Sequence, residues 1–371
     1  MLEGIRIIDF TNYLPGPYAT LRLAEMGAEI IKVEPPSGDP ARNTGRTGEG
    51  KDGPVFRAHN RGKKSIVLDL KSESGRDTAL RLIAGADAII ESFRPGVMDK
   101  LGLGYSEAAG IKPDIVYVSI TGYGKEGEMA QLGSHDLNYM ALSGVLAQLK
   151  DENGRPVHPA NTFADYIGGM AASERLLAGL VSRWKTGKGS YHCLSLTDAM
   201  LSLMANHVLI ENETGYPHGV SVLGGKIVAY NLYETKDGRY ISLGALEPKF
   251  WNAFCLGAGR EDWLPAHFTE AAWDNKVYRE MLSLFKSRTL AEWIQFGQEV
   301  DCCMAPVLEA GELAGFPYFR NRGSISDREA DGRQVKMHGD LPGSLQSIVP
   351  QKGEHANEIL RELESLHSNR S

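Results

Sequence analysis

Short apolar runs alternate with segments of helical spacing through the first third of the chain, and this alternation constrains the fold more than any other feature. The apolar runs are rich in β-branched residues and cover residues 4–10, 28–34, 64–70, 87–91 and 115–120. Residues 18–27 and 74–85 have helical spacing and end at glycines, which commonly cap helices. A chain that repeats strand, helix and strand builds a mostly parallel, doubly wound sheet. The pattern therefore predicts an α/β fold.

The pattern changes after about residue 134, where longer helices are predicted over residues 135–149, 165–185 and 197–214, with a strand at 191–196. Glycines and a proline cluster between residues 215 and 226, which is typical of a linker. Residues 231–245 predict a hairpin with Asp237-Gly238 at its turn. We therefore expect a large domain over residues 1–220 and a smaller α+β domain over 221–330. A C-terminal segment, 331–371, with a helix over 354–367, is expected to return to the large domain.

Composition excludes several classes of protein. The 371 residues carry 40 Lys and Arg against 47 Asp and Glu, a net charge of −7, and nucleic-acid binding would require a basic surface. We find neither a signal peptide nor a run of the ~18 apolar residues that a membrane-spanning helix needs, so we expect no membrane association. The four cysteines, Cys193, Cys255, Cys302 and Cys303, are too few for a disulfide scaffold, and no His or Cys spacing is typical of a metal site. We expect inert thiols, the adjacent Cys302 and Cys303 included, in a cytoplasmic protein without a metal.

The predicted sheet is not accompanied by the usual nucleotide motifs. Residues 12–18, directly after the first strand, lack the Gly-x-Gly-x-x-Gly fingerprint, and no phosphate-binding Gly-x4-Gly-Lys-Ser/Thr occurs. The Gly-x-Ser-x-Gly elbow of the hydrolases is also absent. A dehydrogenase or an ATP-dependent enzyme is therefore the weakest interpretation.

Several motifs in a fixed order carry a family resemblance. They are Leu-Pro-Gly-Pro at residues 14–17, the segments 27–36 and 60–71, Arg-Pro-Gly-Val at 94–97, Leu-Gly-Leu-Gly at 101–104 and Thr-Gly-Tyr-Gly at 121–124. Together they closely resemble the class III coenzyme A transferase family, which also includes α-methylacyl-CoA racemases. The resemblance implies a Rossmann-like large domain, a small domain and a homodimer of two interlocked chains. It also implies an acyl-CoA substrate that brings coenzyme A with it, and no tightly bound cofactor.

Three segments resemble the racemase branch of this family. The motif of residues 134–139 implies that His135 is a catalytic base, and the segment 159–165 implies that Asp165 is the catalytic carboxylate shared by racemases and transferases. Glu247 matches the racemase Glu that supports the His, at a place where many transferases carry a run of glycines. Without these motifs, His135 would be a structural histidine, and Asp165 and Glu247 would be helix caps.

The resemblance also implies a set of residues that bind the CoA substrate. They are Leu68, Asp69, Leu70, Lys71, Ser92, Phe93, Arg94, Lys100, Ser134, Asp136, Asn138 and Tyr139. One position departs from the pattern, because Pro35 stands where many racemases carry an Arg near the CoA phosphates, with Arg42 and Arg46 further along the chain. Lys63, Lys64 and Lys71 are either part of a basic CoA site or an ordinary solvated strand edge.

Two chemistries are compatible with these residues. A racemase would remove the weakly acidic α-proton of a 2-methylacyl thioester and return a proton on the opposite face, and His135 with Asp165 is a workable pair. A CoA transferase would instead use Asp165 as a nucleophile, forming an anhydride and then an enzyme thioester. The presence of both His135 and Asp165 argues against a non-catalytic CoA-binding relative. We expect an epimerase acting on 2-methylacyl-CoA, with CoA transfer between carboxylic acids as the alternative.

Overall fold

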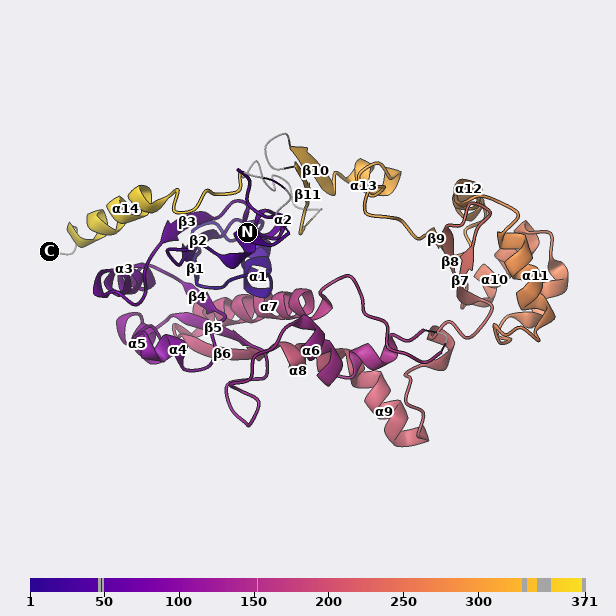
Figure 1. Ribbon diagram of the computed structural model, residues 1–371, viewed down its shortest axis with the longest axis horizontal. Coiled ribbons are helices and arrows are strands. Elements are labelled where there is room, and N and C mark those ends of the chain that lie inside the picture. Colours follow the sequence, from indigo (N-terminus) through magenta and orange to yellow (C-terminus); the bar gives the residue numbers. More distant parts are fainter. Residues whose placement is uncertain (46–47, 49, 152, 329–331, 339–347, 369–371) are drawn as a thin grey trace. The chain divides into compact units, whose positions relative to one another are not determined.

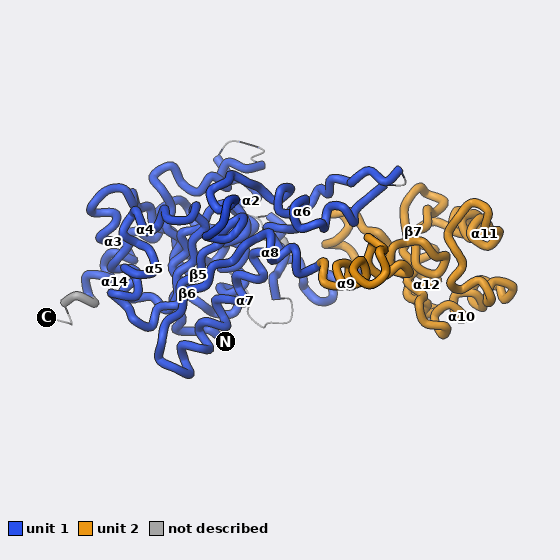
Figure 2. The backbone as a smooth tube through the Cα atoms, turned by 90° about the horizontal axis from the view of Figure 1, so that it is seen from below, with its two compact units in different colours: residues 1–203, 317–371 blue, residues 204–316 orange. Residues whose placement is uncertain are grey.

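The computed structural model describes residues 1–45, 48, 50–151, 153–328, 332–338 and 348–368 (Figure 1). The chain divides into two compact units, Met1–Leu203 with Pro317–Ser371, and Met204–Phe316 (Figure 2). The sequence predicts these divisions at residues 220 and 330. In the structure the first division falls before the helix Ala205–Thr214, and the second falls before the helix Pro317–Arg322.

A six-stranded parallel sheet forms the centre of the first unit. Its strands are β1 Arg6–Asp9, β2 Glu29–Glu34, β3 Lys64–Val67, β4 Ala88–Glu91, β5 Val116–Thr121 and β6 Ser190–Ser195. Their order is β3-β2-β1-β4-β5-β6, and every neighbouring pair is parallel. The predicted α/β fold is confirmed. The order reverses between β1 and β4, and sheets of this kind bind ligands beyond the carboxyl ends of their strands at such a point.

Helices cover both faces of this sheet. The helices of this unit are α1 Pro15–Ala24, α2 Pro54–Asn60, α3 Glu73–Ala84, α4 Val97–Lys100, α5 Tyr105–Ile111, α6 Asp136–Leu142, α7 Phe163–Thr186, α8 Leu196–Leu201, α13 Pro317–Arg322 and α14 Ala356–Ser368. Consecutive strand residues point to opposite faces, so Ile7 packs in a core with α1 and α7, whereas Ile8 packs in a second core with α3 and α14. A short antiparallel pair, β10 Ile325–Arg328 and β11 Gly332–Val335, precedes α14.

Two predicted helices are interrupted in the structure. The helix expected over residues 135–149 ends as α6 at Leu142, because Gly144 takes a left-handed conformation (φ 83°) before a 3₁₀ turn. The helix expected over residues 197–214 is divided into α8 and α9 by a 3₁₀ turn at Ser202–Met204. Apolar spacing continues through both breaks, which explains why the pattern predicted longer helices.

The second unit has the predicted smaller α+β architecture. Strands β7 Tyr230–Glu234, β8 Tyr240–Gly244 and β9 Met304–Pro306 form an antiparallel sheet, and Gly238 (φ 70°) lies in the expected hairpin turn. Its helices are α9 Ala205–Thr214, α10 Pro248–Gly257, α11 Lys276–Phe285 and α12 Leu290–Val300. Aromatic residues dominate its core, with Trp251, Trp263 and Trp293 almost completely buried.

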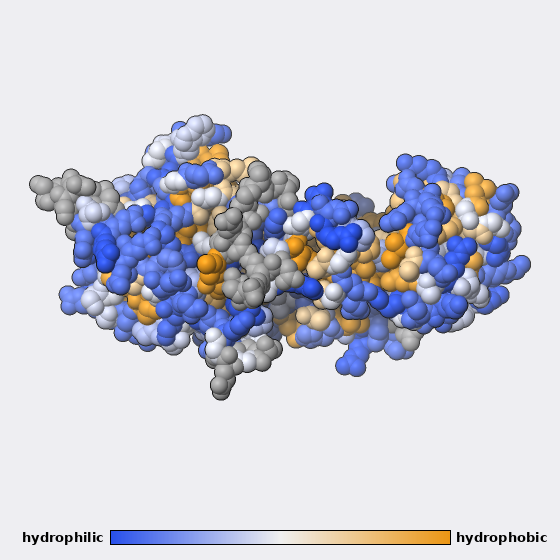
Figure 3. Space-filling view, turned by 90° about the horizontal axis from the view of Figure 1, so that it is seen from above, coloured by the Kyte–Doolittle hydropathy of each residue, from blue (hydrophilic) through white to orange (hydrophobic). Residues whose placement is uncertain are grey.

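One face of the molecule is mostly polar. On the face shown in Figure 3, hydrophilic side chains cover most of the area and apolar ones form separate small patches. Among the described residues, no helix combines the length and apolar character that crossing a bilayer requires.

Candidate active site

A cavity of about 510 Å³ lies beyond the carboxyl ends of β1, β4 and β5, at the point where the strand order reverses. Residues that follow these three strands form part of its wall, together with the segment before α6 and the start of α7. Seven of the predicted site residues line it: Ser92, Phe93, Arg94, Ser134, His135, Tyr139 and Asp165. The structure therefore brings both predicted catalytic residues of the large domain to one cavity.

Asp165 lies in the first turn of α7. Gly169, one turn further on, allows this helix to approach α1, since a Cβ there would lie 2.6 Å from the carbonyl oxygen of Pro15. Burial, together with the nearby Asp136 carboxylate, raises the pKa of Asp165 to about 7. A helix N-terminus favours the charged form, so burial is the stronger effect here. Asp165 is thus divided between its two protonation states near neutral pH.

Asp136 connects the His135 segment to this helix. Its Oδ1 accepts a hydrogen bond from the backbone N–H of Asp165 at 3.0 Å, so it serves as a cap for the first turn of α7. Burial raises the pKa of Asp136. Asn138 has a similar role nearby, because its Oδ1 accepts from the backbone N–H of His135 at 3.0 Å. These two predicted ligand-binding residues therefore organise the backbone around the cavity.

The Thr-Gly-Tyr-Gly motif at the end of β5 allows Ser134 and Tyr139, the neighbours of His135 in sequence, to pack closely against the backbone. A Cβ on Gly122 would lie 2.6 Å from Ser134 Oγ and 2.8 Å from Tyr139 Cε1, so only glycine fits there. This approach allows Ser134 Oγ to donate a hydrogen bond to the Tyr139 hydroxyl at 2.9 Å. The Tyr139 ring is buried, whereas His135 is exposed at the start of α6. The Tyr139 proton is then free to be donated to an oxygen in the cavity.

Arg94 supplies a positive charge at the edge of the cavity. It follows β4, is exposed, and has no hydrogen-bond or ion-pair partner for its guanidinium among the described residues. It also borders a neighbouring cavity of about 370 Å³ whose wall includes Glu91 and Tyr191. Burial raises the pKa of Glu91 to about 7, which reduces its average negative charge. Arg94 is therefore available to bind an anion such as a phosphate.

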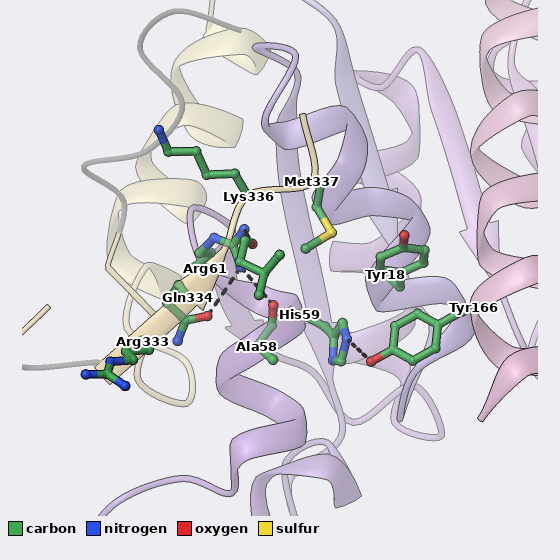
Figure 4. A pocket seen from close by; sticks show the side chains of 10 residues that line it. Tyr18, Ala58, His59, Arg61, Tyr166, Arg333, Gln334, Lys336 and Met337 are labelled. Carbon is green, nitrogen blue, oxygen red and sulfur yellow. Dashed lines mark hydrogen bonds between the residues drawn. The ribbon is translucent and has the colours of Figure 1, made fainter. Parts of the chain in front are cut away.

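Another cavity of about 370 Å³ is lined by Tyr166, the residue after Asp165 (Figure 4). The Tyr166 hydroxyl donates to Nε2 of His59 at 3.2 Å, and Nδ1 of His59 donates to the Val55 carbonyl at 2.8 Å. Burial lowers the pKa of His59 to about 4, so the imidazole stays neutral and keeps this arrangement at neutral pH. The first turn of α7 is thereby tied to α2.

The other predicted binding residues lie outside the 510 Å³ cavity. Leu68 is buried in the core that faces α3, and Leu70 packs against it. Asp69, Lys71 and Lys100 are exposed. Their roles in binding CoA stay predictions.

Glu247 belongs to the second unit. It is exposed and directly precedes Pro248, the first residue of α10, but its side chain makes no capping hydrogen bond. Support of His135 by Glu247 stays a prediction.

The basic residues around β2 and β3 have partners inside the protein. Lys63 is buried and donates to Asp9 and Asn60, and Lys64 pairs with Glu29 and Glu358. The Arg42 guanidinium pairs with Glu34 and Asp52 and lies over the Phe56 ring. None of these three cations is free to replace the arginine absent at Pro35. Arg46 lies outside the described residues.

Comparisons with known proteins show the family of the chain. The family model for CoA-transferase family III matches residues 2–356, and the chain belongs to this family. Alpha-methylacyl-CoA racemase of Mus musculus is 32% identical over 388 residues, covering 100% of this chain and 97% of the racemase. Succinyl-CoA:glutarate CoA-transferase of Homo sapiens is 39% identical over 248 residues, covering 66% of this chain and 56% of that enzyme. A CAIB/BAIF family protein from Brucella suis has a similar structure, with a TM-score of 0.84, 27% identity and coverage of 97% and 98%.

Proposed function

We propose that this protein epimerises the α-carbon of 2-methylacyl-CoA thioesters by proton transfer between His135 and Asp165. The observation that carries the proposal is that His135 and Asp165 border one cavity, where the pKa of Asp165 is raised to about 7. A carboxyl group with this pKa can both donate and accept a proton near neutral pH. Similarity to the racemase over the whole chain supports the same chemistry. Glu247 is proposed to support His135.

The enolate oxygen formed during proton transfer needs a hydrogen-bond donor. The first turn of α7 would be a natural source, but the backbone N–H of Asp165 already donates to Asp136. Tyr139 is better placed, because its hydroxyl accepts from Ser134 and keeps its own proton available. We assign Tyr139 as the donor to the thioester oxygen. Coenzyme A enters as part of the substrate, with no tightly bound cofactor.

CoA transfer between carboxylic acids is the alternative, and the similarity to succinyl-CoA:glutarate CoA-transferase favours it. Asp165 would attack the acyl-CoA thioester and release CoA thiolate, leaving an acyl anhydride on the enzyme. The thiolate would then attack the aspartyl carbonyl, releasing the donor acid and forming an aspartyl-CoA thioester. This reaction consumes a second carboxylic acid as acceptor, whereas epimerisation does not.

Incubation with branched acyl-CoAs in heavy water separates the two reactions. A racemase is expected to exchange the α-hydrogen of 2-methylacyl-CoA for deuterium without any acceptor acid, as measured by mass spectrometry. A transferase is expected to turn over only with an acceptor acid and without deuterium uptake. Acceptor-dependent turnover with no deuterium uptake across the panel would overturn the racemase proposal.

Epimerisation in the direction in which His135 is the base should have a pH dependence opposite in sign to that of CoA transfer. When His135 acts as the base, Asp165 must be protonated, so kcat/KM for that direction of epimerisation is expected to fall as pH rises through about 7. A nucleophilic Asp165 must be ionised, so CoA transfer is expected to increase over the same range. Initial rates between pH 6 and 8 provide the measurement, and a flat epimerisation profile would contradict the assigned role of Asp165.

Replacing Arg94 with Ala is expected to raise KM for acyl-CoA about tenfold and to change kcat little. A cation that binds a phosphate far from the reacting carbon contacts the ground state and the transition state equally. Steady-state kinetics test this, with Arg155→Ala as a control, because Arg155 is also exposed but does not line the cavity. An unchanged KM in folded Arg94→Ala protein would remove Arg94 from the CoA site.

We also propose that the protein forms a homodimer of interlocked chains in the cytoplasm. None of the ten described residues of α9 is buried within its own chain, and Val208 and Leu209 are 58% and 56% exposed. Exposed apolar side chains such as Val208 and Leu209 gain stability when a second chain covers them. Light scattering at micromolar concentration is expected to give twice the monomer mass. A folded monomer under these conditions would contradict interlocking, because linked chains cannot separate without unfolding.

A further inference from the structure

A buried ionic network lies beneath one wall of the 510 Å³ cavity. We call residues 11–15, which follow β1, the wall segment; Asn12, Tyr13, Leu14 and Pro15 line the cavity. Behind it, Lys32 and Asp39 are completely buried and form an ion pair, with Lys32 Nζ 2.8 Å from Asp39 Oδ2. Burial opposes the charge on Lys32, but the carboxylates of Asp9 and Asp39 outweigh this effect and raise its pKa. Lys32 is therefore a stable cation inside the protein.

The network is bonded to the backbone of the wall segment at three points. Lys32 Nζ donates to the Thr11 carbonyl at 2.8 Å, and Asp9 Oδ1 accepts from the Thr11 N–H at 2.9 Å. Asp39 Oδ1 accepts from the Tyr13 N–H at 3.1 Å. The same buried charges that pair with each other thus hold consecutive parts of the wall.

One residue of the wall segment has an unfavourable backbone conformation. Tyr13 has a φ of 62°, a left-handed conformation that is unfavourable for a tyrosine. The residue is 51% exposed, so core packing contributes little to holding it. The hydrogen bond from its N–H to Asp39 is therefore a restraint that can hold the residue in this conformation.

Stability alone does not account for these charges. Desolvating an ion pair costs so much that apolar residues of similar volume are often equally stable or more stable. We propose that Asp39, held in place by Lys32, is a positioning residue: the oxygen that accepts from the Tyr13 N–H preforms the wall segment, so that it binds acyl-CoA without first having to be ordered. The identity of this ligand rests on the proposed function, whereas the restraint on the wall segment does not.

Two substitutions of Asp39 separate positioning from charge pairing. Asp39→Ala removes the acceptor for the Tyr13 N–H, and we expect the Tyr13 amide to exchange with solvent about tenfold faster and the Kd for CoA to rise about tenfold. Asp39→Asn also removes the charge but keeps a carbonyl oxygen in the same place. We expect both quantities in this variant to stay within about threefold of the unmodified protein. Hydrogen exchange of the free protein and calorimetry with CoA provide the measurements.

The Glu25–Arg61 ion pair offers a matched control. Its side chains are also almost completely buried, with relative exposures of 0% and 5%. Glu25 accepts from the backbone N–H groups of Met337 and His338, and Arg61 lines the separate cavity shown in Figure 4. Glu25→Ala is expected to lower Tm while leaving Tyr13 exchange and CoA affinity unchanged.

Three outcomes would overturn the proposal. Asp39→Asn could speed Tyr13 exchange as much as Asp39→Ala, which would indicate that the charge alone matters. Glu25→Ala could weaken CoA binding as much as Asp39→Ala, which would indicate general destabilisation. The Tyr13 amide of the unmodified protein could exchange as fast as an unbonded loop amide, a result that requires no variant to fold. If the unmodified protein binds no CoA, the proposed function fails, and the exchange data still decide the role of Asp39.

Discussion

Asp165→Asn is expected to reduce epimerisation by the ~10²–10⁴-fold that is typical of losing a general acid or base. The amide keeps the shape of the carboxyl group but cannot exchange a proton with the α-carbon. It is also expected to abolish CoA transfer, since an amide is not the nucleophile that this reaction needs. Steady-state rates test both, with Glu174→Gln as a control, because Glu174 is an exposed carboxylate further along α7.

This variant also tests whether the cavity is the active site at all. CoA affinity is expected to stay within about threefold, because the carboxyl group contacts the acyl end of the substrate. Full activity of Asp165→Asn with either class of substrate would place the chemistry elsewhere. Trapping of an acyl group on Asp165 by hydroxylamine would instead favour the transferase.

His135→Ala discriminates between the two reactions. The racemase mechanism predicts a loss of ~10²–10⁴-fold in both epimerisation and deuterium uptake, because the proton acceptor on one face of the substrate is removed. A transferase that uses only Asp165 would lose far less activity. The measurement is the rate of α-deuterium uptake, and CoA affinity by calorimetry shows whether the site remains intact.

His192→Ala is a suitable control for this variant. His192 is partly exposed on β6, bonds to Ser190, and does not line the 510 Å³ cavity. Epimerisation that persists in His135→Ala at more than about a tenth of the original rate would contradict His135 as the base. His135 would then be a structural residue at the start of α6.

Local patterns were sufficient for the sheet and for the start of α7. The apolar strand residues Ile7 and Ile8 are buried on opposite faces of the sheet. A strand that is buried on both faces has a continuous run of β-branched residues, and such a run can be recognised in the sequence. Gly238 has the left-handed backbone conformation that the Asp-Gly turn requires, so the local preference of glycine was sufficient to predict this hairpin. Motifs that resemble the family also led to His135 and Asp165 before their shared cavity was known.

Partners that lie far apart along the chain could not be predicted in this way. Asp136 bonds to the backbone of Asp165, 29 residues away, and Lys63 bonds to Asp9, 54 residues away. A carboxylate or an ammonium group has the same appearance in a sequence whether it faces a ligand, a helix end or a buried counter-charge. The sequence left the role of Lys63 open, and its long-range contacts show it as a buried partner of Asp9, whereas the binding role of Asp136 stays a prediction.

The residues after β1 show most clearly the difference between what the sequence predicts and what folding decides. Their Leu-Pro-Gly-Pro motif was recognised as part of the family pattern, but Asn12, Tyr13 and Leu14 were not predicted to line the cavity. The wall segment is hydrogen-bonded to Lys32 and Asp39, which lie on and after the neighbouring strand β2. The local spacing of apolar residues predicts which segments become strands of the sheet, although it did not locate the breaks after α6 and α8. Only the tertiary structure decides which polar groups reach the cavity, because that choice depends on the burial and hydrogen bonding of groups brought together by folding.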